Sequence, residues 1–288
     1  MSITSALFTG VNGMKAQSEA MGVISNNISN VNTIGYKDAR TLFSDLLSQN
    51  IGHNNSQVGL GTQVQKVENQ FYGGSLQTTS NISDVALQGD NLFFAVAPGT
   101  TTAGVTTPPT AQTPATSQLT RAGAFTVDST GYLVNPDGKF VLDSAGSAIS
   151  FTAGAAAGGA AGGAAASFGR ITGILSDGTI SAVDSTGVSM AASGTGKIGV
   201  IRVQTPTELQ KIGDSLYSGA TPAAGVQTAF VTTLAPTEKI VANSLESSNV
   251  DMASEMVNMI VTQRAYSANS KTISVNDQLT NDAIQMVR

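Results

Sequence analysis

The chain has 288 residues, a net charge of −5, no cysteine, and a charged fraction of only 11%. This length allows one large domain or two ordinary ones with a real hydrophobic core, and the lack of cysteine excludes disulfides and cysteine-ligated metal sites. No run of Lys or Arg occurs, so nothing in the charge pattern points to nucleic acid or an anionic membrane as a partner.

The first 15 residues lack a basic region, a continuous apolar stretch and a small-residue cleavage site, which are the parts of a conventional secretory signal. The chain also lacks the run of about 18 apolar residues that a transmembrane helix needs. We therefore expect no membrane insertion. If the chain is exported, we expect a route that needs no cleaved signal peptide.

Residues 4–30 are predicted to form a helix because apolar residues recur every seven positions. At 1.5 Å per residue it would be about 40 Å long, too long for its own loops to cover. It therefore needs a partner. The repeat consists of Leu7, Met14, Met21 and Ile28, joined on neighbouring positions by Val11, Ile24 and Val31.

A second helix is predicted from about residue 251 to the end of the chain. Ser247, Ser248, Asn249 and Asp251 are good N-capping residues ahead of it. Its register contains Met252, Met259, Tyr266, Ile273 and Val287, interrupted at Thr280 and widened by Met256, Ile260, Leu279 and Ile284. Because both ends carry the same heptad period, we expect the two helices to pack as a coiled coil.

The middle of the chain shows short β-rich runs separated by turn signals, which predicts a mainly antiparallel β domain. The runs lie at 125–127, 132–134 and 140–142, and again at 171–175, 179–183 and 198–203. Two low-complexity insertions, 99–118 (Thr and Pro) and 153–166 (Ala and Gly), are predicted to be surface loops. A weak helix is the alternative for the second, at about 1 kcal/mol per Gly relative to Ala. The fold class is α+β multidomain.

Reactive groups that could form an enzyme site are scarce. The single histidine, His53, lies in a polar stretch, and no HExxH, GxSxG or GxxxxGK[ST] motif occurs. Acidic pairs such as Asp137 with Asp143 fall at turns, where Asp bonds to its own backbone. We predict no enzyme, no catalytic residue, no cofactor and no metal site.

The most distinctive segment is 26–37, with the sequence NNISNVNTIGYK. Asparagine inside a helix competes for backbone hydrogen bonds. One interpretation is an Asn-rich helix end with Gly35 as a left-handed cap. The other, given equal weight, is a hydrogen-bonding strip for a neighbouring subunit.

This segment resembles the flagellar hook and rod axial proteins of bacteria. The resemblance extends to LESSNVD at 245–251, MVNMI at 256–260 and QRAY at 263–266, with VGLG, DVALQG, LTRAGAF and GDSLY in order between the ends. Asn91 stands where the family usually has a Gly before an aromatic pair. The motif residues singled out are Asn26, Asn27, Asn30, Asn32, Gly35, Tyr36, Lys37, Asn249, Val250, Gln263 and Arg264.

The resemblance implies a structural subunit that self-assembles into a helical tube around an export channel. We favour the hook, a curved tube acting as a universal joint. Distal rod proteins of the family carry an extra stretch before the VGLG strand, whereas here only residues 48–58 separate it from the FSDLL segment. The alternative is a distal rod subunit of the basal body. An alternative from another class is a secreted β-domain adhesin or binding module.

The implied organisation has three regions. Residues 1–34 with 248–288 form an inner helical tube domain, residues 35–80 with 231–247 an extended connecting region, and residues 81–230 an outer β-rich domain. Expected assembly residues are Leu7, Val11, Met14, Met21, Ile24, Ile28, Val31, Met252, Met256, Met259, Ile260, Tyr266, Ile273, Ile284 and Val287.

The implied partners are many further copies of this chain, adjacent rod and hook–filament junction proteins, the hook cap and the flagellar export apparatus. The implied location is the flagellar hook at the cell surface, or the basal body for a rod subunit.

Overall fold

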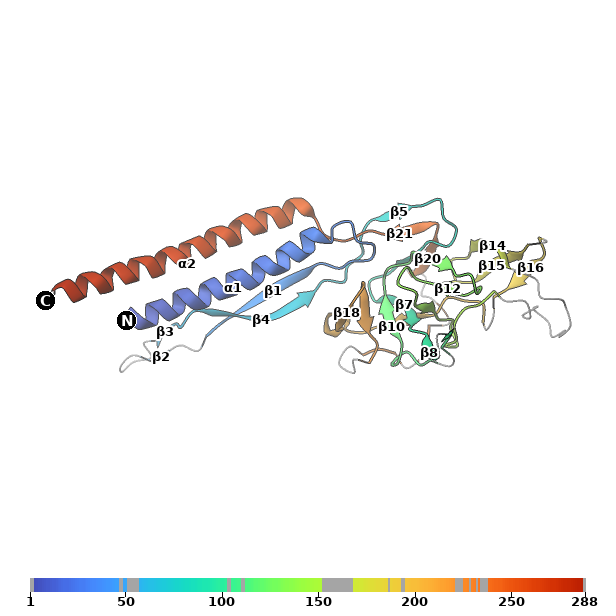
Figure 1. The fold of residues 1–288 in the computed structure, drawn as a ribbon, viewed down its shortest axis with the longest axis horizontal. Coiled ribbons are helices and arrows are strands. Elements are labelled where there is room, and N and C mark those ends of the chain that lie inside the picture. Colours follow the sequence, from blue (N-terminus) through green and yellow to red (C-terminus); the bar gives the residue numbers. More distant parts are fainter. Residues whose placement is uncertain are drawn as a thin grey trace. The chain divides into compact units, whose positions relative to one another are not determined.

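A computed structural model describes residues 3–46, 49–50, 57–102, 105–109, 112–151, 168–185, 187–192, 195–220, 225–227, 229–231, 233 and 238–286. Long helices lie at the two ends of the chain, and the region between them is mainly antiparallel β structure (Figure 1). His53, Val287 and the insertion 153–166 lie outside the described residues.

The chain divides into two compact units. One, here called the helical unit, comprises Met1–Val31, Lys37–Gln70 and Val250–Arg288. The other, the β unit, comprises Asn32–Tyr36 and Phe71–Asn249. The predicted division into three regions stays a prediction.

The helical unit joins the two ends of the chain to one long hairpin. Its elements are α1 (Ile3–Ser29), β1 (Ala39–Asp45), β2 (Gln49–Asn50), β3 (Gln57–Val58), β4 (Thr62–Asn69) and α2 (Met252–Met286). Helix α1 packs against α2, and β1 and β4 run along α1 (Figure 1). Strands β1 and β4 pair antiparallel from Ala39 opposite Asn69 to Asp45 opposite Thr62.

The start of α2 confirms the predicted capping. The Asp251 carboxylate accepts the Ala253 backbone N–H at 3.1 Å, a donor that the first turn leaves free, and it also accepts the Ser254 hydroxyl at 2.6 Å. The hydrogen bond from Ser254, followed by that from Ala253, lowers the pKa of the Asp251 carboxyl from its ordinary value because both stabilise the charged form.

The end of α1 differs from the expected cap. The helix ends at Ser29, and the Asn30 N–H bonds back to the carbonyls of Asn26 and Asn27. Gly35 does adopt a left-handed backbone, with φ of +66°, but it lies in a later turn, where its N–H donates to the Glu246 carbonyl at 2.8 Å. The prediction that Gly35 caps the helix is therefore wrong, because the helix is already closed several residues earlier.

The β unit is built from antiparallel pairings among short strands. The main sheet has the order β11-β12-β13-β7-β10-β19-β18, with β17 also pairing to β7, and β14-β15-β16 form a second sheet. Two-stranded pairs complete it: β20 with β6, β21 with β5, and β8 with β9. The predicted hairpins at 125–142 and 171–183 are confirmed.

The elements of the β unit are mostly short strands. They are β5 (Leu76–Thr78), β6 (Val85–Gln88), β7 (Leu92–Ala97), β8 (Thr100–Thr102), β9 (Val105–Thr107), β10 (Gln118–Thr120), β11 (Thr126–Val127), β12 (Leu133–Val134), β13 (Phe140–Val141), β14 (Phe168–Ile174), β15 (Ile180–Asp184), β16 (Ser189–Ala191), β17 (Val200–Arg202), a 3₁₀ turn (Pro206–Glu208), β18 (Lys211–Gly213), β19 (Leu216–Ser218), β20 (Lys239–Ala242) and β21 (Ser244–Glu246).

The insertion 99–118 is not entirely loop, contrary to the prediction. It contains the β8–β9 hairpin, with Thr100 opposite Thr107. Threonine is β-branched and favours extended backbone. The low complexity of the insertion therefore does not exclude strand structure.

Strand β7 lies at the centre of the β unit because its two faces are both buried. Phe94 and Val96 enter one apolar cluster, and Phe93 and Ala95 enter the other. Successive side chains of a strand point to opposite faces, so this one strand joins both cores.

Candidate assembly surface

The face of α1 that α2 and the hairpin cover consists of small residues. Gly10, Gly13, Ala16 and Ala20 are buried. A Cβ added at Gly13 would lie 2.7 Å from Asn269 Nδ2 of α2, and one at Gly10 would lie 3.0 Å from Ile273 Cγ1. The backbone of α1 therefore approaches α2 closely, and larger residues at these positions would push the helices apart.

The predicted heptad residues flank this contact and remain partly open within one subunit. On α1, Val11 is exposed, whereas Leu7, Met14, Met21, Ile24 and Ile28 are half-buried, as is Val31 just beyond it. On α2, Met259 and Ile273 are half-buried, and Met252, Met256, Ile260, Tyr266 and Ile284 are exposed. One subunit thus leaves much of the predicted apolar surface uncovered.

Four apolar residues form one side of the first turns of α2, here called the far face: Ala253, Met256, Val257 and Ile260. They follow the i, i+3, i+4, i+7 spacing of one helical face, and Thr262, which is buried, lies on the opposite side. Met256 and Ile260 are each 50% exposed and Val257 is 60% exposed. A helix that is apolar on two sides is normally covered on two sides.

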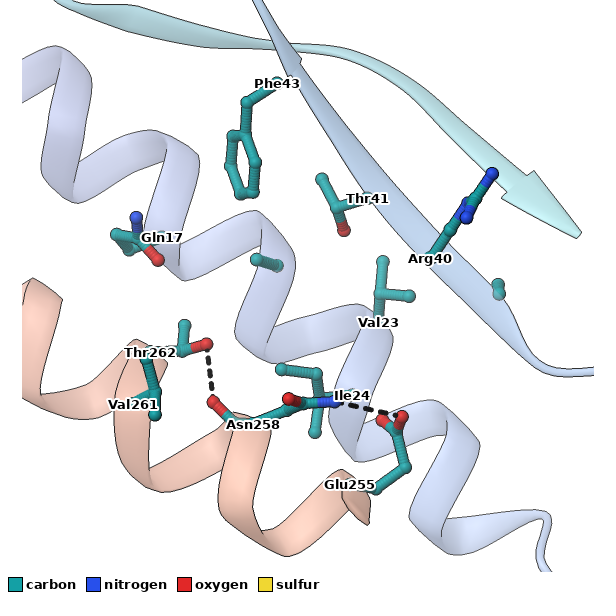
Figure 2. A pocket seen from close by; sticks show the side chains of 12 residues that line it. Gln17, Val23, Ile24, Arg40, Thr41, Phe43, Glu255, Asn258, Val261 and Thr262 are labelled. Carbon is teal, nitrogen blue, oxygen red and sulfur yellow. Dashed lines mark hydrogen bonds between the residues drawn. The ribbon is translucent and has the colours of Figure 1, made fainter. Parts of the chain in front are cut away.

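The helical unit also contains an open pocket of about 280 Å³, here called the trough. Ala20, Val23 and Ile24 of α1 line its floor, β1 forms one wall and α2 forms the other (Figure 2). The wall residues include Thr41 and Phe43 from β1 and Glu255, Asn258, Val261 and Thr262 from α2. Gln17, Ala39 and Arg40 complete the lining, so an apolar floor is bordered by polar groups.

Asn27 joins the three elements beside the trough. Its Nδ2 donates to the Ala39 carbonyl at 2.8 Å, its Oδ1 accepts the Ala39 N–H at 3.0 Å, and its Nδ2 also lies 3.3 Å from Glu255 Oε2. Asn27 is 1% exposed. Its hydrogen bonds are therefore made within the subunit, and the second interpretation of the Asn-rich segment, a strip for a neighbour, does not apply to Asn27.

Asn27→Asp is expected to destabilise the helical unit in a pH-dependent way. The introduced carboxylate would face the Ala39 carbonyl and the Glu255 carboxylate, and burial would add to that repulsion, so its folded-state pKa is raised. Its protonated form can still donate. The variant therefore keeps its full stability below the unfolded-state pKa of the introduced carboxyl, about 4. It loses stability as the pH rises through the higher folded-state pKa of that carboxyl.

The check is thermal unfolding of the helices followed by circular dichroism from pH 4 to 8. Asn26→Asp is the matched control, since Asn26 is exposed on the same helix. Equal pH dependence for both variants would contradict the role given to Asn27.

The remaining family-motif residues fall in several environments. Asn30 donates from Nδ2 to the Asn26 carbonyl at 2.9 Å, and Asn249 Nδ2 donates to the Tyr72 carbonyl at 3.4 Å. Tyr36 is buried with the Lys211 ammonium 4.5 Å from its ring centroid. Lys37 and Val250 are buried, and Asn32, Gln263 and Arg264 are exposed.

A buried ion pair in the β unit was missed by sequence reasoning, although both partners lie in quoted motifs. Arg121 and Glu246 are 0% and 1% exposed, and Arg121 NH1 lies 3.3 Å from Glu246 Oε2. Arg121 also donates to the carbonyls of Gly89 and Asp90. Burial lowers the pKa of the Arg121 guanidinium from its ordinary value, and the Glu246 carboxylate opposes this shift.

Glu246 connects this pair to the segments around it. Its Oε1 accepts the Gly74 N–H at 3.0 Å, and its backbone carbonyl accepts the Gly35 N–H. The guanidinium of Arg121 lies 5.1 Å from the Phe93 ring centroid, at the core strand β7. Segments far apart in the chain therefore meet at one ion pair.

Within the described ranges, no three His, Cys, Asp or Glu side chains gather where they could hold a metal ion. Among the helices that the structure describes, none combines the length and apolar character needed to cross a membrane.

Two long helices from opposite ends of the chain, with open apolar faces and a β unit between them in sequence, are the features of a structural subunit that joins an assembly. Residues 7–37 match the family described as flagella basal body rod protein, and residues 241–286 match the flagellar basal body rod FlgEFG protein C-terminal family.

Relatives extend the match to the whole chain. The flagellar basal-body rod protein FlgG of Bacillus subtilis is 32% identical over 98% of this chain and 99% of its own length. FlgG of Borreliella burgdorferi is 31% identical over 95% of each chain. The flagellar hook protein FlgE of Treponema pallidum is 39% identical over 46% of this chain and 27% of its own length.

The chain belongs to the flagellar rod and hook protein family. The resemblance stated from the sequence motifs is thereby confirmed, and its relatives are structural axial proteins of the flagellum. Both predicted members, hook and distal rod, occur among these relatives.

Proposed function

We propose that the chain is a rod-type axial subunit that self-assembles into a straight helical tube of the flagellum. One observation carries this preference: the rod proteins match 95–98% of this chain from end to end, whereas the hook proteins match 46% of it. The hook is the second candidate, supported by 39% identity over the 46% of this chain that the Treponema pallidum hook protein matches.

In this proposal the helical unit forms the inner tube and the β unit forms the outer part of the assembly. Helices α1 and α2 meet as a short coiled coil within one subunit, and the open heptad residues contact neighbouring copies. Methionine suits such contacts because its flexible thioether adapts to neighbours of different shape. Rod and hook–filament junction proteins, the hook cap and the export apparatus are the proposed further partners.

The protein is proposed to act without catalysis. Its buried charged groups are used structurally, as in the pair of Arg121 with Glu246 and the turn carboxylate of Asp143, which accepts backbone N–H groups of Ala145, Ser147 and Thr195. The proposed location is the basal body, or the cell-surface hook for the second candidate.

Electron microscopy of the purified, concentrated protein tests the proposal. Straight tubes support the rod, and curved tubes support the hook instead. A monomer that persists at all concentrations would contradict both.

A further inference from the structure

We propose that the far face of α2 of one copy docks into the trough of the next copy. The inference rests on the proposed function, because it requires that the chain self-assembles. Beyond the proposed function, it specifies which two surfaces of neighbouring copies are in contact.

The trough has the form of a receptor for a helix. Its floor is apolar, and both walls carry exposed apolar side chains, Phe43 at 44% and Val261 at 60%. Figure 2 shows α1, with Gln17 and Ile24, between the β1 wall that carries Phe43 and the α2 wall that carries Val261 and Thr262. Amphipathic helices bind such grooves through anchors spaced at i, i+3, i+4 and i+7.

The far face supplies anchors at that spacing. Ala253, Met256, Val257 and Ile260 give a ridge of two turns, about 10 Å long. Met256 and Ile260, one turn apart, are large enough to reach the floor. The ridge and the trough floor are both apolar. Contact between them therefore lowers the free energy in proportion to the apolar area removed from water.

The two surfaces are different parts of the same unit. Glu255, Asn258, Val261 and Thr262 of α2 line the trough, whereas none of the four far-face residues does, although Val261 lies one turn beyond Val257 at the edge between the two surfaces. One copy can therefore donate its far face and receive another at the same time. Such a heterologous contact continues through many copies as a ring or a helix, which is the geometry of a tube.

Charge agrees with this pairing. Arg264 is exposed one turn beyond Ile260 on the same side of α2, and the trough contains the Glu255 carboxylate. The other charge of the lining, Arg40, already has a partner in Glu68 at 2.9 Å. An incoming arginine would thus meet a carboxylate, and complementary charges fix the register of an interface.

The test uses single-cysteine variants, because the natural chain has no cysteine. Ile260→Cys is mixed with Thr41→Cys or with Phe43→Cys, assembled, and oxidised mildly. Ser18→Cys, on an exposed side of α1 away from the trough, is the matched control partner. Mixed dimers on a non-reducing gel with either trough variant, and not with the control, are the expected result.

Other outcomes would overturn the proposal. Cross-linking of Ile260→Cys to itself alone would show that the far faces pair with each other. Tubes that form normally without a mixed dimer at either trough position would exclude this docking while leaving the proposed function intact. If the unmodified protein forms no tubes, the proposed function fails and this inference fails with it.

A second variant needs no cross-link. Ile260→Asp should raise the protein concentration required for tube formation by about ten-fold or more, as loss of one buried anchor does. Ile260→Leu should assemble normally. Equal assembly of both variants would contradict the docking.

Discussion

Arg121→Met is expected to destabilise the β unit by about 3–5 kcal/mol, because it leaves the Glu246 carboxylate buried without its counter-ion. The variant also removes the hydrogen bonds to the carbonyls of Gly89 and Asp90. Methionine approximates the length of the lost side chain, so the effect comes mainly from charge and hydrogen bonding. Urea unfolding of the variant and the natural protein, followed by near-UV circular dichroism, measures it.

Two further variants separate the causes. Glu246→Gln added to Arg121→Met should restore much of the stability, since the amide oxygen can still accept the Gly74 N–H and no unpaired charge is buried. Arg121→Lys keeps the positive charge but loses the planar guanidinium with its paired donors. Its free energy of unfolding should lie between those of Arg121→Met and the natural protein. If the double variant were no more stable than Arg121→Met, the buried charge would not be the cause.

Met259→Asp is expected to abolish tube formation while leaving the β unit folded. Met259 is half-buried on the side of α2 that faces α1, and a carboxylate there would lack a partner once neighbouring copies cover it. A penalty of about 3 kcal/mol raises the required concentration by roughly a hundred-fold. Sedimentation and electron microscopy measure assembly, and thermal unfolding measures the β unit.

Met21→Asp, in the corresponding stripe of α1, should behave in the same way. Met259→Leu controls for the loss of methionine, and Leu175→Asp, at a 53% exposed position of the β unit, controls for the added charge. Both controls should form tubes. Normal tubes from Met259→Asp would contradict the assembly role of this helix.

Features set by local pattern could be predicted from the sequence. The heptad period predicted α1 and α2, the cluster ending at Asp251 predicted the start of α2, and turn residues predicted the hairpins of the β unit. Each depends on residues a few positions apart. The β8–β9 hairpin was not predicted, because a low-complexity composition typical of loops hides the strand preference of β-branched threonine.

Features set by long-range contacts could not be predicted. Arg121 and Glu246 are 125 residues apart, and no local pattern indicates that they meet. The heptad pattern of large apolar residues does not indicate the covered face of α1, because close helix approach depends on the small residues Gly10, Gly13, Ala16 and Ala20. The trough was also invisible in the sequence, since it needs β1 beside two helices.

Asn27 and Glu255 are 228 residues apart in the chain, yet they touch beside the trough. The helical unit is therefore built from segments that are far apart in the sequence. A product of interrupted translation or proteolysis that lacks the last 40 residues would have no α2, and so neither a far face nor a complete trough. We therefore expect a chain without α2 to be left out of the assembly that we propose.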